Sequence, residues 1–342
     1  MLWALFLFWT LPIGLVVAIE KLRIFAFWKN YFVGFFIFAL VYYTIDKRIQ
    51  IKALIIGLIV WGLSLAIIEF KVLIDLGGFS AGIVGLYLKK NLLSITWGRS
   101  NYLASFFVLI IPITIGYLFY TKSFRLKIFT FFSLIIMSFA VMLTLSRGGI
   151  LALAIALIIL SFRTLKTKTL VPFLALIFIL ILVVLLNPLT YVIIEGVSNL
   201  ETSGSVYTRI NFYEDTWRAF LNYPITGVGF GNLGYYSTFI LAEGTSFSAH
   251  NIVLGMLGEV GLVGGIFFFL ILGSIITNLF KEFLEEKDNA LKVLRWSFLS
   301  SIIGGCLHSL VEPTFEGFQF SIIFWLIVGI SSNLHQLKSN SN

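Results

Sequence analysis

Long apolar runs follow one another along most of the chain, and they constrain its fold more than any other feature. A run of about twenty apolar residues is long enough to cross the hydrocarbon core of a bilayer as a helix. The mean hydropathy of +1.01 and the 12% of charged residues lie far outside the range of soluble domains. We therefore predict an all-α, polytopic transmembrane bundle that forms a single integral membrane domain over residues 1–342.

Polar residues divide these runs into about ten predicted spans. The first run lacks a basic start and a small-residue cleavage site, so we expect it to span the membrane and not to be a signal peptide. The predicted spans are 1–19, 30–45, 51–69, 101–120, 127–146, 148–162, 169–186, 252–280, 294–311 and 318–334.

Lysine and arginine are concentrated in alternate connections between the spans. The connections "DKRIQIK", "TKSFRLK", "RTLKTK" and "KEFLEEKDNALKVLR", with the C-terminal tail, hold more than half of the 24 lysines and arginines. The positive-inside rule places these connections and both termini in the cytoplasm. The remaining connections then lie outside the membrane, and two of them, 70–100 and 187–249, are long.

The external loop 187–249 is expected to be partly helical. In "SVYTRINFYEDTWRAFLNYP", Val206, Ile210, Tyr213 and Trp217 recur at helical spacing, which predicts an amphipathic helix on the outer membrane surface. The stretch "ITGVGFGNLGYY" that follows is rich in glycine, which favours turns and a close approach of the backbone to a ligand.

Two arginines on the predicted outer side have no acidic partner nearby in sequence. Arg147 interrupts a long apolar stretch, and such arginines usually mark a functional site. Arg209 has no acidic residue at helical spacing, whereas Arg218 follows Glu214 by one turn. Guanidinium groups match phosphate oxygens, so an anionic group is expected there and a diphosphate is a natural candidate. The structural alternatives are a helix end for Arg147 and a snorkelling side chain for Arg209. Arg99 adds positive charge on the same side, either as a ligand or as part of a solvated rim.

His250 lies where a polar loop turns into an apolar helix, on the same predicted side as the arginines. Ser248 and Asn251 keep its surroundings polar. A neutral imidazole there could accept a proton from a hydroxyl group, although a helix cap or an interface residue is the alternative. His308 and Glu312, toward the outer end of the ninth span, could line the same cavity or form hydrogen bonds within the bundle. For Glu259, inside an apolar helix, we expect a structural partner.

Several motifs are missing from the sequence. It has no cluster of residues at metal-ligand spacing, no phosphate-binding loop and no dinucleotide fingerprint. The single cysteine, Cys306, rules out a disulfide within the chain. We expect no cofactor, no metal and no nucleic-acid partner, so that any reaction uses an already activated substrate.

The chain resembles the O-antigen ligase and polymerase family of bacterial membrane glycosyltransferases over roughly residues 95–335. The resemblance lies in "LTLSRGGILALA", "YTRINFYEDTWRAFLNYPITGVGFGNLG" and "SAHNIVLGMLGEVGLVGGIFFFLIL", which occur in the order of the family, and more weakly in "RSNYLASFFVLIIPI".

The resemblance implies transfer of a glycan from an undecaprenyl diphosphate carrier to an acceptor hydroxyl at the outer face of the cytoplasmic membrane, without nucleotide or metal. Arg147 and Arg209 would hold the diphosphate, and His250 would orient or deprotonate the acceptor. Backside attack would invert the anomeric centre. The acceptor is a lipid, a polymer or a second carrier-linked glycan, and both ligase and polymerase remain open. Further candidates for substrate binding are Arg99, Asn251, His308 and Glu312.

The alternative function is a transporter or flippase for an anionic lipid-linked sugar. Such a protein should carry polar residues at the middle of the membrane, in broken helices of two related halves. The unexplained charges of this chain are instead predicted to gather at the outer face.

Overall fold

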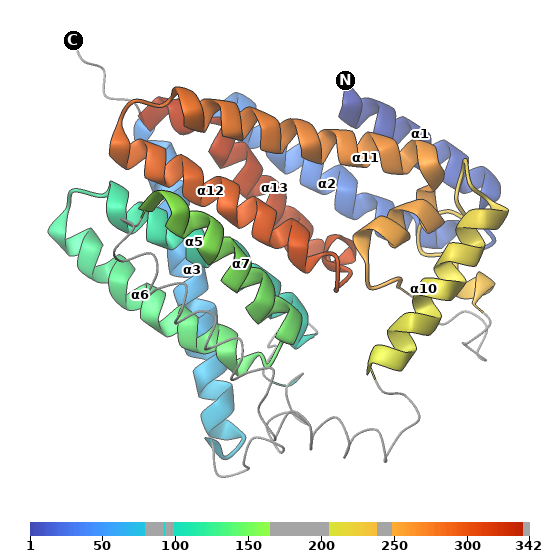
Figure 1. Cartoon of the computed structure of the whole chain (residues 1–342), viewed down its shortest axis with the longest axis horizontal. Helices are drawn as coiled ribbons and strands as arrows, with labels where there is room; N and C mark the ends of the chain where they lie inside the picture. Colours follow the sequence, from blue (N-terminus) through green and yellow to red (C-terminus); the bar gives the residue numbers. More distant parts are fainter. Residues whose placement is uncertain (79–91, 93–96, 98, 165–204, 238–247, 338–342) are drawn as a thin grey trace. The chain divides into compact units, whose positions relative to one another are not determined.

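The computed structural model describes residues 1–78, 92, 97, 99–164, 205–237 and 248–337 (Figure 1). All regular elements of these residues are helices, which confirms the predicted all-α class. Six of the described helices are long and apolar enough to cross a membrane, namely α2 (Lys21–Thr44), α3 (Arg48–Asp75), α5 (Ser100–Tyr120), α6 (Phe124–Leu143), α11 (Ile252–Glu285) and α12 (Asn289–His308). Three more helices have apolar stretches that are shorter than 18 residues, namely α1 (Leu2–Val17), α7 (Arg147–Thr164) and α13 (Phe318–Ser332).

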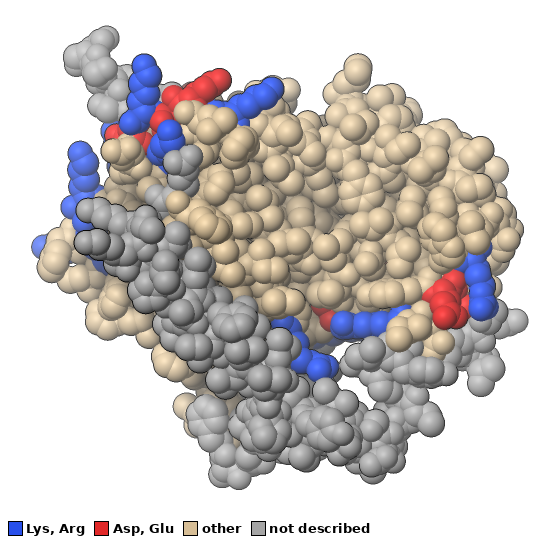
Figure 2. Space-filling view, viewed as in Figure 1, with Lys and Arg blue, Asp and Glu red and all other residues tan. Residues whose placement is uncertain are grey.

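Nine of the ten predicted spans each overlap one of these helices, and the tenth, 169–186, lies outside the described residues. Figure 2 shows uncharged surface along most of α11, with charged side chains gathered near its C-terminal end. Helix α2 begins at Lys21, well before the predicted start at residue 30. Charged side chains near this start have partners within unit 1, so they are compatible with a helix here. Arg23, for example, lies over the Tyr235 ring, 5.3 Å from its centroid.

The chain divides into two compact units, each made of separate stretches of sequence. Unit 1 consists of Met1–Ile37, Ile194–Thr277 and Ser309–Trp325. Unit 2 consists of Phe38–Ile193, Asn278–His308 and Leu326–Asn342. Both units contain helices apolar enough for a membrane, and the single integral membrane domain stays a prediction.

Helix α5 forms the centre of unit 2 and is surrounded by α3, α6, α7 and α12. Small residues allow close approach of these helices. A side chain at Gly304 of α12 would lie 2.9 Å from Ala156 of α7 and 3.1 Å from Val108 of α5. The Ser301 hydroxyl on the same helix donates to the backbone oxygen of Leu109, so that α12 is fixed against α5 by packing and by hydrogen bonds.

Aromatic side chains form the core of unit 1. Phe6, Tyr31, Phe230 and Phe268 are almost fully buried, and their rings pack in stacked, tilted and edge-on pairs with centroids 5.0 to 6.0 Å apart. Such pairs add stabilisation beyond the area that they bury. Phe230 belongs to the glycine-rich stretch, so the core anchors this turn between the first helices and α11.

The glycine-rich stretch interrupts helix α11, which the sequence predicted as continuous. Gly261 has φ 67° and ψ −173°, a conformation that only glycine adopts readily. Backbone hydrogen bonds of 2.8 to 3.0 Å replace the lost helical ones, from Val228 to Gly258, from Gly229 to Glu259 and from Leu262 to Pro224. The Glu259 carboxylate accepts a further bond of 2.9 Å from the Gly231 N–H, which is the structural partner expected for this residue.

The end of this stretch also contacts the amphipathic helix α10 (Ser205–Asn222) and the residue after it. The rings of Tyr236 and Tyr223 lie edge to face with centroids 5.4 Å apart. Burial, followed by the hydrogen bond and charge of Tyr223, raises the pKa of Tyr236 to about 12. Tyr236 is therefore a neutral phenol at physiological pH.

Candidate active site

The predicted site residues fall into two groups, one in each unit. Unit 1 holds Arg209, His250, Asn251 and Glu312, and unit 2 holds Arg99, Arg147 and His308.

Arg209 lies on α10, where the sequence predicted an amphipathic helix. One face of α10 packs on the rest of unit 1 through Ala219. This residue is buried in a cluster with Val228, Leu233 and Ala249. Of the predicted apolar stripe, Ile210 and Trp217 are 50% and 45% exposed. These two side chains therefore point away from the rest of unit 1, and contact of the predicted stripe with the membrane surface stays a prediction.

Arg209 has an acidic partner that the sequence did not reveal. Its Nη2 donates to Oε1 of Glu312 in a short ion pair. The expectation that Arg209 lacks an acidic partner is therefore wrong, because that expectation considered only neighbouring helical turns and Glu312 lies 103 residues further along the chain. The Glu312 side chain is 3% exposed and that of Arg209 is 31% exposed. A guanidinium has five N–H donors, so Arg209 keeps donors for an anion.

The same carboxylate reaches His250. Nδ1 of His250 lies 3.4 Å from Oε2 of Glu312, a close contact without hydrogen-bond geometry. The imidazole ring is nearly parallel to that of Phe212, at 12° and 6.0 Å between centroids. His250 has φ 48°, and unusual backbone of this kind clusters at functional sites. Glu312 thus joins a guanidinium and an imidazole in one cluster.

The start of α11 positions His250. Oδ1 of Asn251 accepts hydrogen bonds from the N–H groups of Val253 and Leu254, at 2.9 and 3.1 Å, and so caps the helix. The N–H of Ile252 donates to the Ser309 carbonyl at 2.8 Å, which ties this end of α11 to the connection that carries Glu312. Asn251 therefore has a structural role beside His250, and its contact with substrate stays a prediction.

A second carboxylate, Glu316, lies in the same connection and was not among the predicted site residues. Its Oε1 accepts a 2.7 Å hydrogen bond from the Ser248 hydroxyl, and its backbone oxygen accepts one of 2.6 Å from Asn30. Ser248 in turn accepts a 3.3 Å hydrogen bond from the His250 N–H. The sequence feature that could have revealed Glu316 as a site residue is the pair of glutamates four residues apart in "VEPTFEG", between two apolar spans.

In unit 2, Arg147 and Arg99 lie at the starts of adjacent helices. Arg147 is the first residue of α7, and Arg99 precedes α5. A side chain at Gly149 would lie 2.7 Å from the Ala104 side chain, so the two helices start close together. Both arginines are exposed, and neither has an ion pair within the described part of the chain. His308, the last residue of α12, is buried. The convergence of Arg147 with Arg209 and His250 stays a prediction.

The cluster in unit 1 combines two chemical abilities. A guanidinium binds phosphate oxygens, and an imidazole accepts or donates a proton near neutral pH. Within the described ranges, no three histidine, cysteine or acidic side chains are grouped to hold a metal ion.

Comparison with known protein families identifies part of the chain. Residues 132–269 match the family described as O-antigen ligase, and this stretch includes Arg147, Arg209 and His250. None of the curated proteins that were compared matches the chain. Residues 132–269 are therefore similar to the O-antigen ligase family, and the described helices are long and apolar enough for a multi-pass membrane protein.

Proposed function

We propose that this protein is a bacterial cell-surface polysaccharide ligase or polymerase. It transfers a glycan from an undecaprenyl diphosphate carrier to an acceptor hydroxyl at the outer face of the cytoplasmic membrane, by an inverting reaction that needs no metal. The observation that carries the proposal is the Glu312 carboxylate, which contacts both Arg209 and His250. This contact places an anion-binding group and a candidate base in one cluster.

Arg209 binds the diphosphate. When the bond between the anomeric carbon and the diphosphate oxygen breaks, negative charge accumulates on the leaving group. A guanidinium that holds this charge more tightly than the intact donor stabilises the transition state. Arg147, exposed at the start of α7, is proposed as the second guanidinium, with Arg99 and His308 as further contacts to the substrate.

His250 accepts the proton of the attacking hydroxyl. Glu312 lies on the Nδ1 side of the ring, which leaves Nε2 for the acceptor. The carboxylate orients the imidazole and stabilises the imidazolium that forms as the proton moves. The acceptor oxygen attacks the anomeric carbon from the face opposite the diphosphate, so the configuration inverts.

The transfer is tested with purified protein in liposomes that contain a carrier-linked oligosaccharide and an acceptor membrane extract. The measured quantities are free undecaprenyl diphosphate and the size of the glycan product, with and without EDTA. Wild-type protein is compared with Arg209→Ala and His250→Ala. Arg218→Ala is the matched control, because Arg218 lies on the same helix, is 58% exposed and pairs with Glu214.

We expect EDTA-resistant release with transfer of the glycan in the wild type and in Arg218→Ala, and its loss in the other two variants. Stepwise lengthening of a carrier-linked product indicates a polymerase, whereas one transfer to a different molecule indicates a ligase. Normal transfer by Arg209→Ala or His250→Ala contradicts the proposal.

A transporter for an anionic lipid-linked sugar is the second candidate, and the break in α11 favours it. Broken helices often form the binding sites of transporters. In this chain, however, the break is filled, because a side chain at Gly261 would lie 2.2 Å from the Ile225 oxygen. Movement of the intact lipid-linked glycan between leaflets, without release of undecaprenyl diphosphate, would support the transporter.

A further inference from the structure

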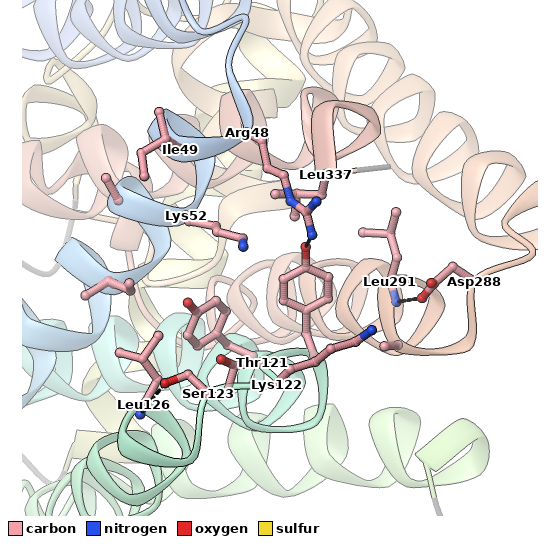
Figure 3. Close-up of a pocket in the computed structure, with 15 residues that line it drawn as sticks. Arg48, Ile49, Lys52, Thr121, Lys122, Ser123, Leu126, Asp288, Leu291 and Leu337 are labelled. Carbon is pink, nitrogen blue, oxygen red and sulfur yellow. Dashed lines mark hydrogen bonds between the residues drawn. The ribbon is translucent and has the colours of Figure 1, made fainter. Parts of the chain in front are cut away.

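A pocket of about 720 Å³ lies at one end of unit 2, apart from the proposed transfer residues. It is formed by the first turns of α3, the connection between α5 and α6, and the start of α12 (Figure 3). Tyr117 and Tyr120, at the C-terminal end of α5, line it. Arg99 precedes the other end of this 21-residue helix, which at 1.5 Å per residue is roughly 30 Å long. The pocket is therefore distinct from the place of Arg99 and Arg147.

The pocket is positively charged. Arg48 and Lys52 extend from α3 into the same space, and Lys122 lines it from the connection after α5 (Figure 3). Within the described part of the chain none of these three cations has an ion pair, although Arg48 donates a long hydrogen bond to Tyr120. Asp288 also lines the pocket, but its Oδ1 accepts a 2.8 Å hydrogen bond from the N–H of Leu291. That carboxylate caps α12.

Three helices begin at the pocket; Asp288 already caps α12, and the N-termini of α3 and α6 remain to favour an anion. Arg48 begins α3, Ser123 precedes α6 and Asp288 precedes α12, and all three residues line the pocket. The partial positive charge of a helix N-terminus adds to that of nearby cations. Hydroxyl groups of Thr121 and Ser123 supply further hydrogen-bonding groups. This combination matches the oxygens of a phosphate group.

The surroundings of the pocket favour a lipid over a soluble phosphate compound. Ile49 lines the pocket and is 72% exposed, and Phe124, next to Ser123, is 75% exposed. Exposed apolar side chains beside unpaired cations suit a molecule with a charged head and acyl chains. The volume also exceeds what one phosphate ion would fill, since ligand pockets of roughly 300 to 1,000 Å³ hold much larger molecules.

We propose that this pocket binds the phosphate headgroup of an anionic phospholipid, through Arg48, Lys52 and Lys122. Basic pockets between membrane helices are known to recognise such headgroups. The lipid would hold together the ends of α3, α5 and α12. This role does not depend on the glycan transfer.

The test compares binding of phosphatidylglycerol and phosphatidylcholine to the purified full-length protein in detergent, by native mass spectrometry. The pocket variant is Arg48→Gln with Lys52→Gln. The matched control, Arg125→Gln with Lys127→Gln, removes the same charge from exposed positions of α6 that do not line the pocket. At about 1 kcal/mol per cation, we expect phosphatidylglycerol to bind roughly 30-fold more weakly to the pocket variant. The control variant should bind it like the wild type.

Each of three results would overturn the proposal. Equal losses in both double variants would show that only overall charge matters. Equal binding of the two lipids by the wild type would show that the pocket does not select an anion. Displacement of the lipid by millimolar inorganic phosphate or glycerol phosphate would assign the pocket to a soluble anion. If the pocket variant does not fold, Lys122→Gln alone should weaken phosphatidylglycerol binding roughly fivefold, and no change there would also contradict the proposal.

Discussion

At the scale of single residues, Glu312 organises the candidate site. It is buried, and it touches Arg209 through one carboxylate oxygen and His250 through the other. The sequence context predicted the arginine and the histidine, because each interrupts a pattern that its neighbours set. The pairing could not be predicted, since it joins residues that are distant in the chain and depends on how the connection after α12 folds. Glu312 was expected to touch substrate, and the structure places it behind the two groups that are proposed to do so.

Glu312→Gln should lower the rate of glycan transfer, but by less than the about 100-fold to 10,000-fold expected for loss of the base itself, because the carboxylate only orients the imidazole. The amide keeps the shape of the side chain but loses the charge that orients His250. In a His250→Ala background the same change should cost little more, because residues that act through one another are not additive. Transfer rates of the four proteins measure this cycle.

Glu214→Gln is the control for Glu312→Gln, since Glu214 is 59% exposed on α10. A full additional loss from Glu312→Gln in the His250→Ala background would show that Glu312 does not act through the histidine.

At the scale of elements, hydrophobic periodicity and length predicted most of the helices. The break in α11 was not predicted, although its sequence contains "GEVGLVGG". A glycine within an apolar run is compatible with a continuous helix, and the break depends on hydrogen bonds from the distant stretch 224–229. The early start of α2 was missed for a related reason, because charged residues near its start find partners in the fold.

Gly261→Ala should destabilise the protein by about 1 to 3 kcal/mol or more. The alanine would be strained at φ 67° and would clash with the carbonyl oxygen of Ile225. Gly273→Ala in the same helix is the control, because a side chain there meets nothing within 4 Å. That change should leave stability unchanged or raise it by up to about 1 kcal/mol. Thermal unfolding in detergent measures both, and equal melting temperatures would contradict the broken helix.

At the scale of the whole molecule, the spread of charge along the chain predicts the orientation in the membrane. The predicted cytoplasmic connections before α3, after α5 and before α12 all contribute to one pocket of unit 2, as expected for connections on the same side. The division into two units could not be predicted, since each unit is made from separate stretches of sequence.

Cysteine labelling of intact cells tests the orientation. In a Cys306→Ser background, Asp46→Cys should be protected from a membrane-impermeant maleimide, because the connection between α2 and α3 is predicted to lie in the cytoplasm. Asn222→Cys, at the exposed end of α10, should react. Both positions should react once the cells are permeabilised. The reverse pattern in intact cells would place the proposed site on the cytoplasmic side and contradict the account.

Affinity for the product undecaprenyl diphosphate, measured beside the transfer rate, tests the central claim most directly. Arg209 is proposed to bind the diphosphate, and His250 is proposed to accept the proton of the attacking hydroxyl. His250→Ala should therefore bind undecaprenyl diphosphate like the wild type while transfer falls about 100-fold to 10,000-fold. Arg209→Ala should bind it roughly 10-fold to 100-fold more weakly, the loss expected for a charged hydrogen bond. Wild-type affinity in Arg209→Ala, or undiminished transfer in His250→Ala, would contradict the division of roles between these two residues.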